Sequence, residues 1–237
     1  MQQAEAAVGS AEQRIPLKKR LTTAAEKHGL IIAFFIVVAF FSIASENFLS
    51  YKNVMLVLRQ VSVLGTIAIG MTIVITVGHF DLSVGSLVSL TAVVVISMHD
   101  VVGPVPAMLI TIVVGMISGA FIGYLVGYLK LNSLIITLGM LVGLQAIVLI
   151  YTGGKYTRIV APDETWFGVI GRGFIFGIPL PVIILGVLLL IFSIILLKTV
   201  FGRQVFSVGG NPMASKFSGI SDKKVIFLAF LISGALT

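Results

Sequence analysis

Long runs of apolar residues alternate with short polar segments along most of the chain. The runs are about 17 to 25 residues long, and an α-helix of about 20 residues crosses the hydrocarbon core of a bilayer. We therefore predict membrane-spanning helices over residues 30–48, 54–77, 82–98, 105–129, 133–152 and 180–197. A further apolar run occupies the last thirteen residues, from Val225 to Thr237. As a helix it measures only about 20 Å, too short to cross the bilayer, so we expect it to be the start of a seventh span in a longer protein.

Basic residues gather in two polar stretches, Arg14–Lys27 and Lys198–Lys224, which together hold ten of the sixteen lysines and arginines. Loops rich in lysine and arginine tend to stay in the cytoplasm, and an even number of crossings between the two stretches agrees with both lying there. We therefore expect a basic cytoplasmic N-terminal segment over residues 1–28. A transmembrane domain follows over residues 29–237, with a cytoplasmic loop at about 198–224.

The N-terminal region allows more than one interpretation. The first apolar run fits the core of a cleaved signal peptide, with Ser42 and Ala44 as the small residues before the cut. The segment in front of it is long for a signal peptide and further spans follow at once, so we favour a retained first helix. The basic segment itself suits either a short helix on an anionic membrane surface or a solvated stretch of chain.

Composition agrees with a membrane protein, because 58 % of the residues are hydrophobic and only 11 % are charged. Such a chain cannot hide its apolar surface in a soluble core. The net charge of +7 does not indicate a nucleic-acid partner, since the basic residues cluster at the two ends of the chain and not along one helical face. The absence of cysteine excludes disulfides, a thiolate nucleophile and a cysteine-based metal site.

Glycines recur every four residues in the fourth predicted span, at Gly115, Gly119, Gly123 and Gly127. This spacing places them on one stripe of the helix, where a neighbouring backbone can approach closely. Glycine is common in membrane helices, but four in phase favour a packing face. Gly139 and Gly143 repeat the spacing in the next span, and the partner can lie in the same subunit or in a second one.

Motifs for catalysis are weak. The sequence "TGGK" at Thr152–Lys155 lacks the upstream glycine of a phosphate-binding loop, and tyrosine follows it where serine or threonine would hold magnesium. The glycines of "GRGFIFG" at 171–177 have the wrong spacing for a dinucleotide-binding turn. His28, His79 and His99 fall in separate segments. We predict no catalytic residue, no metal site and no cofactor in this chain.

The stretch "GHFDLSVGS", Gly78–Ser86, places a carboxylate between two apolar runs. Asp81 can cap the helix that follows, because its side chain can accept from the free N–H groups of the first turn. Ionisable groups at such a position also tend to face a polar cavity. In that case Asp81, Ser83 and Ser86 line or gate a translocation path, and the two roles are compatible.

The cytoplasmic loop contains the sequence "GGNPMASKFSGI". The glycines break the backbone, Pro212 suits the first turn of a short helix over Met213–Phe217, and Gly219 ends it. Such a helix lies outside the bilayer, where it is available to a partner protein. A lid over the ends of the membrane helices is the alternative.

Three segments in this order resemble the membrane-spanning permease subunit of bacterial ABC importers for ribose, xylose and related monosaccharides. They are "GHFDLSVGS", "LIITLGMLVGLQAIVLIYTGG" and "FGRQVFSVGGNPMASKFSGI", and the resemblance extends from about residue 50 to the end. It implies an all-α polytopic transmembrane helical bundle in the bacterial inner membrane, with a cytoplasmic N-terminus and further helices beyond the present end. It also implies a coupling loop that presses on the ATPase and that contains Gly209, Gly210, Asn211, Pro212, Ala214, Gly219 and Ile220.

The resemblance further implies several partners. The permease pairs with a second permease subunit of like or unlike sequence, docks ABC ATPase subunits that bind ATP and magnesium, and receives a monosaccharide from a periplasmic sugar-binding protein. Two positions depart from the family pattern: His79 replaces a common glycine, as in the branch for xylose and multiple sugars, and Ser133 replaces a common proline. The helix kink that this proline would impose is therefore in doubt.

The expected mechanism is alternating access driven by the partner ATPase. An uncharged sugar needs only weak polar contacts, for which Asn132, Ser133 and Gln145 are candidates beside the Asp81 segment. A secondary sugar transporter or channel that needs no ATP would instead show coupling-ion carboxylates within spans and an inverted repeat, and neither is seen in this sequence. A scaffold that only assembles partners would not need the polar Gly78–Ser86 segment.

Overall fold

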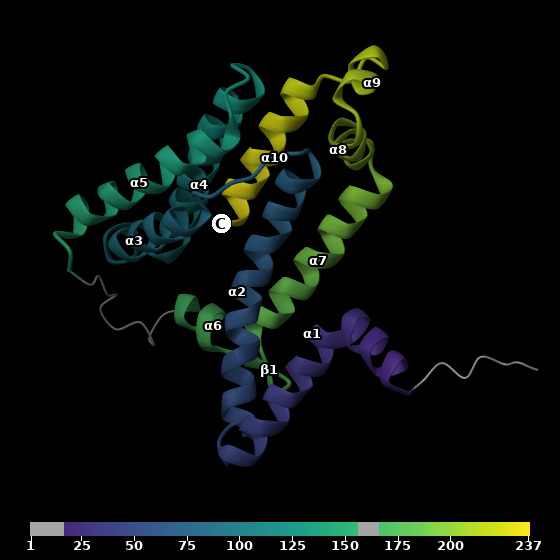
Figure 1. Ribbon diagram of the computed structural model, residues 1–237. Helices are drawn as coiled ribbons and strands as arrows, with labels where there is room; N and C mark the ends of the chain where they lie inside the picture. Colours follow the sequence, from purple (N-terminus) through teal and green to yellow (C-terminus); the bar gives the residue numbers. More distant parts are fainter. Residues whose placement is uncertain (1–16, 156–165) are drawn as a thin grey trace, which may run out of the picture. The chain divides into compact units, whose positions relative to one another are not determined.

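The computed structural model of the protein describes residues 17–155 and 166–237. These residues form ten α-helices and one small β-hairpin (Figure 1). The helices are α1 (Leu17–Ala44), α2 (Tyr51–Thr76), α3 (Val84–Val102), α4 (Pro104–Gly127), α5 (Ser133–Thr152), α6 (Trp166–Arg172), α7 (Leu180–Lys198), α8 (Val200–Gly210), α9 (Pro212–Phe217) and α10 (Asp222–Leu236). The two strands, β1 (Phe174–Ile175) and β2 (Ile178–Pro179), pair antiparallel between α6 and α7.

The predicted spans coincide with helices. Within the described ranges, α2, α3, α4, α5 and α7 are long and apolar enough to cross a membrane, judged by length and composition. The first predicted span falls on the apolar part of α1, Gly29–Ala44. Residues Met1–Val54 form one compact unit, and residues Met55–Thr237 form a second, which holds the bundle described below.

Helix ends follow from local sequence. Pro104 occupies the first turn of α4, where its missing N–H costs nothing. Asn132 caps α5 by accepting a hydrogen bond at 2.9 Å from the amide of Leu134. Gly153 ends α5 in the left-handed conformation, with φ of 59°. Helix α5 begins at Ser133, and a proline is compatible with this first position of a helix, so a proline at 133 would not by itself kink α5.

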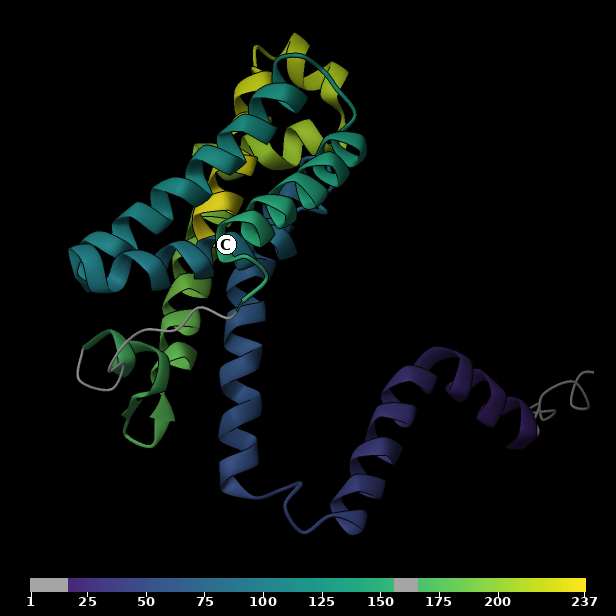
Figure 2. The same cartoon turned by 90° about the vertical axis from the view of Figure 1, so that its left-hand side faces the viewer.

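Helix α10 packs against the glycine stripe of α4 along its whole length (Figures 1 and 2). A Cβ atom added at Gly115 or Gly119 would overlap the carbonyl oxygen of Gly234 or Phe230. One added at Gly123 would lie 2.9 Å from the carbonyl oxygen of Phe227. At Gly127 the matching distance, to the carbonyl oxygen of Lys223, is 2.8 Å. The predicted packing face is therefore confirmed, and its partner lies in the same chain.

A neighbouring face of α10 meets α2. A Cβ added at Gly70 of α2 would lie 2.8 Å from the Cα atom of Ser233. In contrast, an added Cβ at Gly139 or Gly143 of α5 would meet nothing within 4 Å. The glycine spacing of α5 therefore does not mark a packing face within the described chain, although it repeats the pattern of α4.

The buried core lies where α2, α4, α8 and α10 meet. Phe230 of α10 and Ile73 of α2 are fully buried there, together with the α4 side chain Ile122. The other buried apolar members are Val74, Val77, Val126, Val205, Val208, Val225, Ile226 and Ala229. Most remaining large apolar side chains are exposed, and none of the α7 residues is buried, as expected of helices that face lipid.

We predict that Gly119→Ala destabilises the protein, because the new methyl group overlaps the Phe230 carbonyl. Overpacking of this kind costs about 1–3 kcal/mol, which a lowered thermal midpoint of the detergent-solubilised protein would reveal. The matched control is Gly139→Ala, where the methyl meets open space and better helix propensity is worth about 0.5–1 kcal/mol. Equal midpoints for the two variants would contradict the close approach of α4 and α10.

Candidate functional site

Polar and irregular segments gather at one end of the Met55–Thr237 unit. They are the α2–α3 loop, the α4–α5 loop and the α8–α9 segment, which Figure 1 shows toward the same end of the bundle. The basic loop at 198–224, predicted above to be cytoplasmic, lies at this end. It holds most of the candidate site residues.

Helix α9 is fixed at both ends by its own sequence. The side chain of Asn211 accepts from the amide of Ala214 at 3.0 Å, and Pro212 occupies the first turn. At the other end Gly219 has φ of +77°, and its N–H donates to the carbonyl of Lys216. The N–H of Ile220 donates to the carbonyl of Ser215, which completes a Schellman motif. The predicted start and end of this short helix are confirmed.

One face of α9 is anchored and the other is exposed. Ser215 is buried, and its hydroxyl lies 2.7 Å from the hydroxyl of Ser207 on α8. On the outer face Met213 is 66 % exposed and Phe217 is 86 % exposed. Sequence reasoning did not single out these two side chains as site residues, although two large apolar residues four apart in a basic loop were a usable signal. Together they give α9 an apolar surface that the described residues leave uncovered.

The preceding segment differs from the expectation. The two glycines of "GGNP" were expected to break the backbone, but α8 continues through Gly209 and Gly210, and the break falls at Asn211, with φ of −155° and ψ of 97°. A Cβ added at Gly209 would overlap the carbonyl oxygen of Thr76. The glycine is thus required for α8 to pack on the C-terminal end of α2.

The α2–α3 loop contacts α5 and α10. Nδ1 of His79 lies 3.4 Å from the hydroxyl of Ser133, and its ring centroid lies 6.2 Å from that of Phe230. Burial, together with the positive charge of Lys130, lowers the pKa of His79. The imidazole is therefore neutral near pH 7 and can share one hydrogen bond with Ser133. The two positions that depart from the family pattern, 79 and 133, touch each other.

Asp81 is buried and bonds locally. Its Oδ1 accepts from the amide of Ser83 at 2.9 Å and from the hydroxyl of Ser83 at 2.6 Å. Ser83 is the N-cap residue of α3, and no side chain caps its first turn. The expectation that Asp81 caps this helix is therefore wrong, because its carboxylate reaches only the residue before the first turn. Burial raises the pKa of Asp81, and the two bonds from Ser83 oppose that rise.

The candidate path residues fall into separate groups. Asp81, Ser83 and Ser86 are buried together, with the Ser86 hydroxyl donating to the Ser83 carbonyl at 2.8 Å. Asn132 is exposed at the start of α5, and Gln145 is exposed about 20 Å further along that helix. A common path for these residues stays a prediction.

An ion pair joins the α4–α5 loop to the start of α10. Nζ of Lys130 lies 2.7 Å from Oδ2 of Asp222. The hydrogen bond from Lys130 holds the pKa of Asp222 below its ordinary value of 3.8. This pair closes the polar end of the α4–α10 contact, one turn beyond Gly127.

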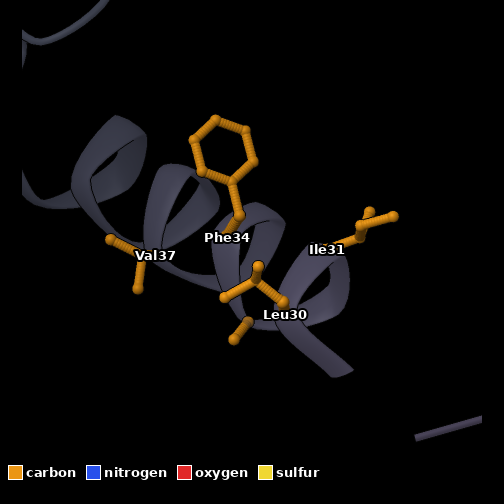
Figure 3. A pocket seen from close by; sticks show the side chains of 5 residues that line it. Leu30, Ile31, Phe34 and Val37 are labelled. Atoms are coloured by element: carbon orange, nitrogen blue, oxygen red, sulfur yellow. The ribbon is translucent and has the colours of Figure 1, made fainter. Parts of the chain in front are cut away.

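A separate hollow lies on α1, lined by Leu30, Ile31, Ala33, Phe34 and Val37 (Figure 3). All five side chains are apolar and come from one helix, so they offer a polar ligand no hydrogen bond. We interpret it as helix surface that faces lipid.

The fold and this arrangement define a polytopic helical membrane protein with a short exposed helix at one end. The chain belongs to the permease family whose description reads "Branched-chain amino acid transport system / permease component", and the match covers residues 53–237. Its relatives identify the branch as permeases of sugar ABC importers, which confirms the resemblance.

Three relatives illustrate the similarity. The ribose import permease protein RbsC of Haemophilus influenzae is 34 % identical over 208 residues, which are 87 % of this chain and 64 % of the relative. RbsC of Bacillus subtilis is 34 % identical over 213 residues, 90 % of this chain and 66 % of the relative. The xylose transport system permease protein XylH of Haemophilus influenzae is 33 % identical over 269 residues, which cover 87 % of this chain and 72 % of the relative. No solved structure matches the chain.

We predict different outcomes for two adjacent glycines. Gly209→Ala places a methyl group on the Thr76 carbonyl and should cost about 1–3 kcal/mol, lowering the thermal midpoint of the purified permease. Gly210→Ala meets nothing within 4 Å and should leave the midpoint unchanged. If Gly210→Ala is the more damaging of the two, the described packing of α8 on α2 is wrong.

We also predict a modest pH effect from the Lys130–Asp222 pair. Because the pKa of Asp222 is lower in the folded protein than its ordinary value of 3.8, the ionised side chain stabilises the folded state fully above pH 3.8. This stabilisation disappears as the pH falls through the lower pKa of the folded protein. Asp222→Asn should flatten this acid-side loss of stability and cost at most about 1 kcal/mol at neutral pH. The measurement is the thermal midpoint against pH, with Lys224→Gln, an exposed charge change in the same turn, as control. An unchanged pH profile for Asp222→Asn would exclude a role for the pair.

Proposed function

We propose that this chain is the membrane-spanning subunit of an ATP-driven importer that carries a monosaccharide across the bacterial inner membrane. Relatives of this chain are named as permeases for ribose, xylose, L-arabinose and galactofuranose, and the chain spans about 64 % of the length of the ribose permease of Haemophilus influenzae. The supporting observation in the chain itself is α9, a capped helix with exposed Met213 and Phe217 on a basic loop. An apolar surface in such a place suits a permanent protein partner.

The partner that we assign to α9 is the ABC ATPase subunit, which would bind ATP and magnesium. Movement of α9 would reach the membrane helices by two short routes. The Ser215–Ser207 contact and Gly209 connect it through α8 to the end of α2. Ile220 connects it to α10, which begins at Asp222. Because both routes are closely packed, α9 would act as a rigid lever and not as a loose tether.

Alternating access would follow from the packing of α10 between α4 and α2. Glycine surfaces allow one helix to slide or rock against another without side chains that interlock, which suits a transition between two arrangements. The Asp81 segment lies next to this contact, because its neighbour His79 touches Phe230 of α10. A sugar needs only weak polar groups along its path, and Asp81, Ser83, Ser86, Asn132 and Gln145 remain our candidates.

The remaining assignments complete the importer. A second permease subunit would provide the other half of the path, and a periplasmic sugar-binding protein would deliver the sugar and determine its identity. The N-terminus would lie in the cytoplasm, on the same side as α9. The competing function is secondary transport without ATP.

Transport into proteoliposomes separates the two functions. The full-length permease is reconstituted with its ATPase subunits inside the vesicle, and uptake of labelled monosaccharide is measured with the binding protein outside. Our proposal predicts uptake that requires ATP and that an ion gradient alone cannot drive. Uptake under an ion gradient without ATP would contradict the importer proposal and support secondary transport.

We predict that Phe217→Ser weakens the ATPase interaction, because it removes a large apolar side chain from the exposed face of α9. The central apolar residues of interfaces each contribute about 2 kcal/mol or more, so the dissociation constant should rise roughly 30-fold. Co-purification and titration of the ATPase subunit measure this change. Phe217→Leu keeps the apolar surface and should retain binding. Normal binding by Phe217→Ser would exclude α9 as the docking helix.

A further inference from the structure

The hairpin between α6 and α7 carries an apolar tip. Phe174 pairs with Pro179 and Ile175 pairs with Ile178. The two turn residues, Phe176 and Gly177, have φ values of 51° and 80°, so the turn is of type I′. Phe176 is 100 % exposed, and Phe174, Ile175 and Ile178 are each about half exposed. From Phe174 to Leu180 the sequence contains no charged side chain and no side-chain hydrogen-bonding group.

The turn conformation makes Phe176 unusual. Both central positions of a type I′ turn need positive φ, and asparagine or glycine is the preferred residue there. A bulky side chain adopts this conformation rarely. Phe176 gains no compensating burial within the described chain, because it is fully exposed. What stabilises this conformation therefore lies outside the residues that the structure describes.

Contacts along α2 give the level of the hairpin in the bundle. The guanidinium of Arg59 lies 5.4 Å from the ring centre of Phe174 and donates a hydrogen bond to the carbonyl of Arg172 at 3.0 Å. Further along, a Cβ at Gly65 would lie 2.8 Å from the Leu185 side chain of α7. Ile69 and Thr72 then share a groove with α7 residues from Leu189 to Leu196. Later residues of α2 thus contact later residues of α7, so the two helices run in the same direction. Helix α7 therefore begins near the level of Arg59.

The length of α7 fixes the membrane boundary. Its 19 residues measure about 28 Å, close to the roughly 30 Å of the hydrocarbon core, and none of its side chains is buried. Its first residue, Leu180, therefore lies at one edge of the hydrocarbon. The amide of Leu180 donates to the carbonyl of Gly173 at 2.9 Å, so the hairpin is joined directly to this edge. Figure 1 shows it at the end of α7 away from α8.

We infer that the tip of this hairpin inserts into the bilayer, at the boundary between headgroups and acyl chains of the leaflet opposite the α8–α9 segment. The lipid surface accepts Phe176 and its apolar neighbours, whereas a protein partner would more often meet a polar rim, which the tip lacks. Arg59 lies at the same level, where a guanidinium reaches the headgroup region. The insertion holds the start of α7 and the Arg59 side of α2 at a fixed depth. This insertion does not depend on the proposed transport function.

The chain has no cysteine, so single labels can be placed without background. In the full-length protein reconstituted in phosphatidylcholine and phosphatidylglycerol vesicles, Phe176→Cys carries a nitroxide, and its collisions with oxygen and with a water-soluble nickel chelate are measured. Oxygen partitions into lipid and the chelate into water. Phe217→Cys on α9 is the aqueous reference, and Ile194→Cys, half exposed on α7, is the lipid reference.

Insertion predicts a ratio of oxygen to nickel collisions at residue 176 that is several-fold above that of Phe217→Cys and approaches that of Ile194→Cys. A ratio equal to the aqueous reference would overturn the inference by placing the tip in water. Low collision rates with both reagents would also overturn it, because another protein segment or a second copy would then cover the tip.

A second variant keeps the test independent of the label at the turn. Phe176→Asn removes the apolar side chain while favouring the type I′ turn, so the hairpin should still form. With the nitroxide moved to Ile175→Cys, the inference predicts that Phe176→Asn raises nickel collisions several-fold at residue 175. Unchanged collisions would show that Phe176 does not hold the hairpin in the bilayer.

Discussion

The structure depends on one contact, the backbone of α10 lying against the backbone of α4. Between helices in lipid there is little hydrophobic force, so association relies on close van der Waals packing. Four glycines on α4 and Gly234 on α10 allow this approach, and any side chain at Gly119 would meet the Phe230 carbonyl. Once α10 is fixed in this way, the segment before it is fixed too, because only Ser221 separates Ile220 from the first residue of α10. The position of α9 at the end of the bundle follows from that contact.

The two ends of the bundle then have different chemistry. At the α8–α9 end, hydroxyl and amide groups hold short helices and loops in place, and the exposed surface of α9 is small and apolar. The buried Asp81 lies in the same region, two residues from His79, which touches both α5 and α10. Packed groups therefore connect α9 to the polar α2–α3 loop. At the opposite end the hairpin offers apolar side chains alone, which suits a lipid boundary.

Local patterns in the sequence predicted most of the helices and one packing face. Apolar run length predicted the spans, and Pro212 and Gly219 predicted the start and the end of α9, because these signals act within a few residues. Contacts between distant segments were beyond such patterns: the partner of the glycine stripe is about 110 residues away, and His79 meets Ser133 across 54 residues. Helix α8 was not predicted, and the break expected at its paired glycines was wrong, because Gly209 serves close packing on α2. The β1–β2 hairpin was not predicted, because strands of two residues have no detectable hydrophobic period.

The most direct test of the α4–α10 contact is a zero-length cross-link. A carbodiimide joins a lysine to a carboxylate only where the two already touch, and the Lys130–Asp222 pair, with 2.7 Å between Nζ and Oδ2, is such a place. Mass spectrometry of the cross-linked, membrane-embedded protein should identify an amide between Lys130 and Asp222 that Asp222→Asn abolishes. If Lys130 is instead joined to another carboxylate, with Asp222 modified but not joined to it, α10 does not start beside the end of α4 and the account fails.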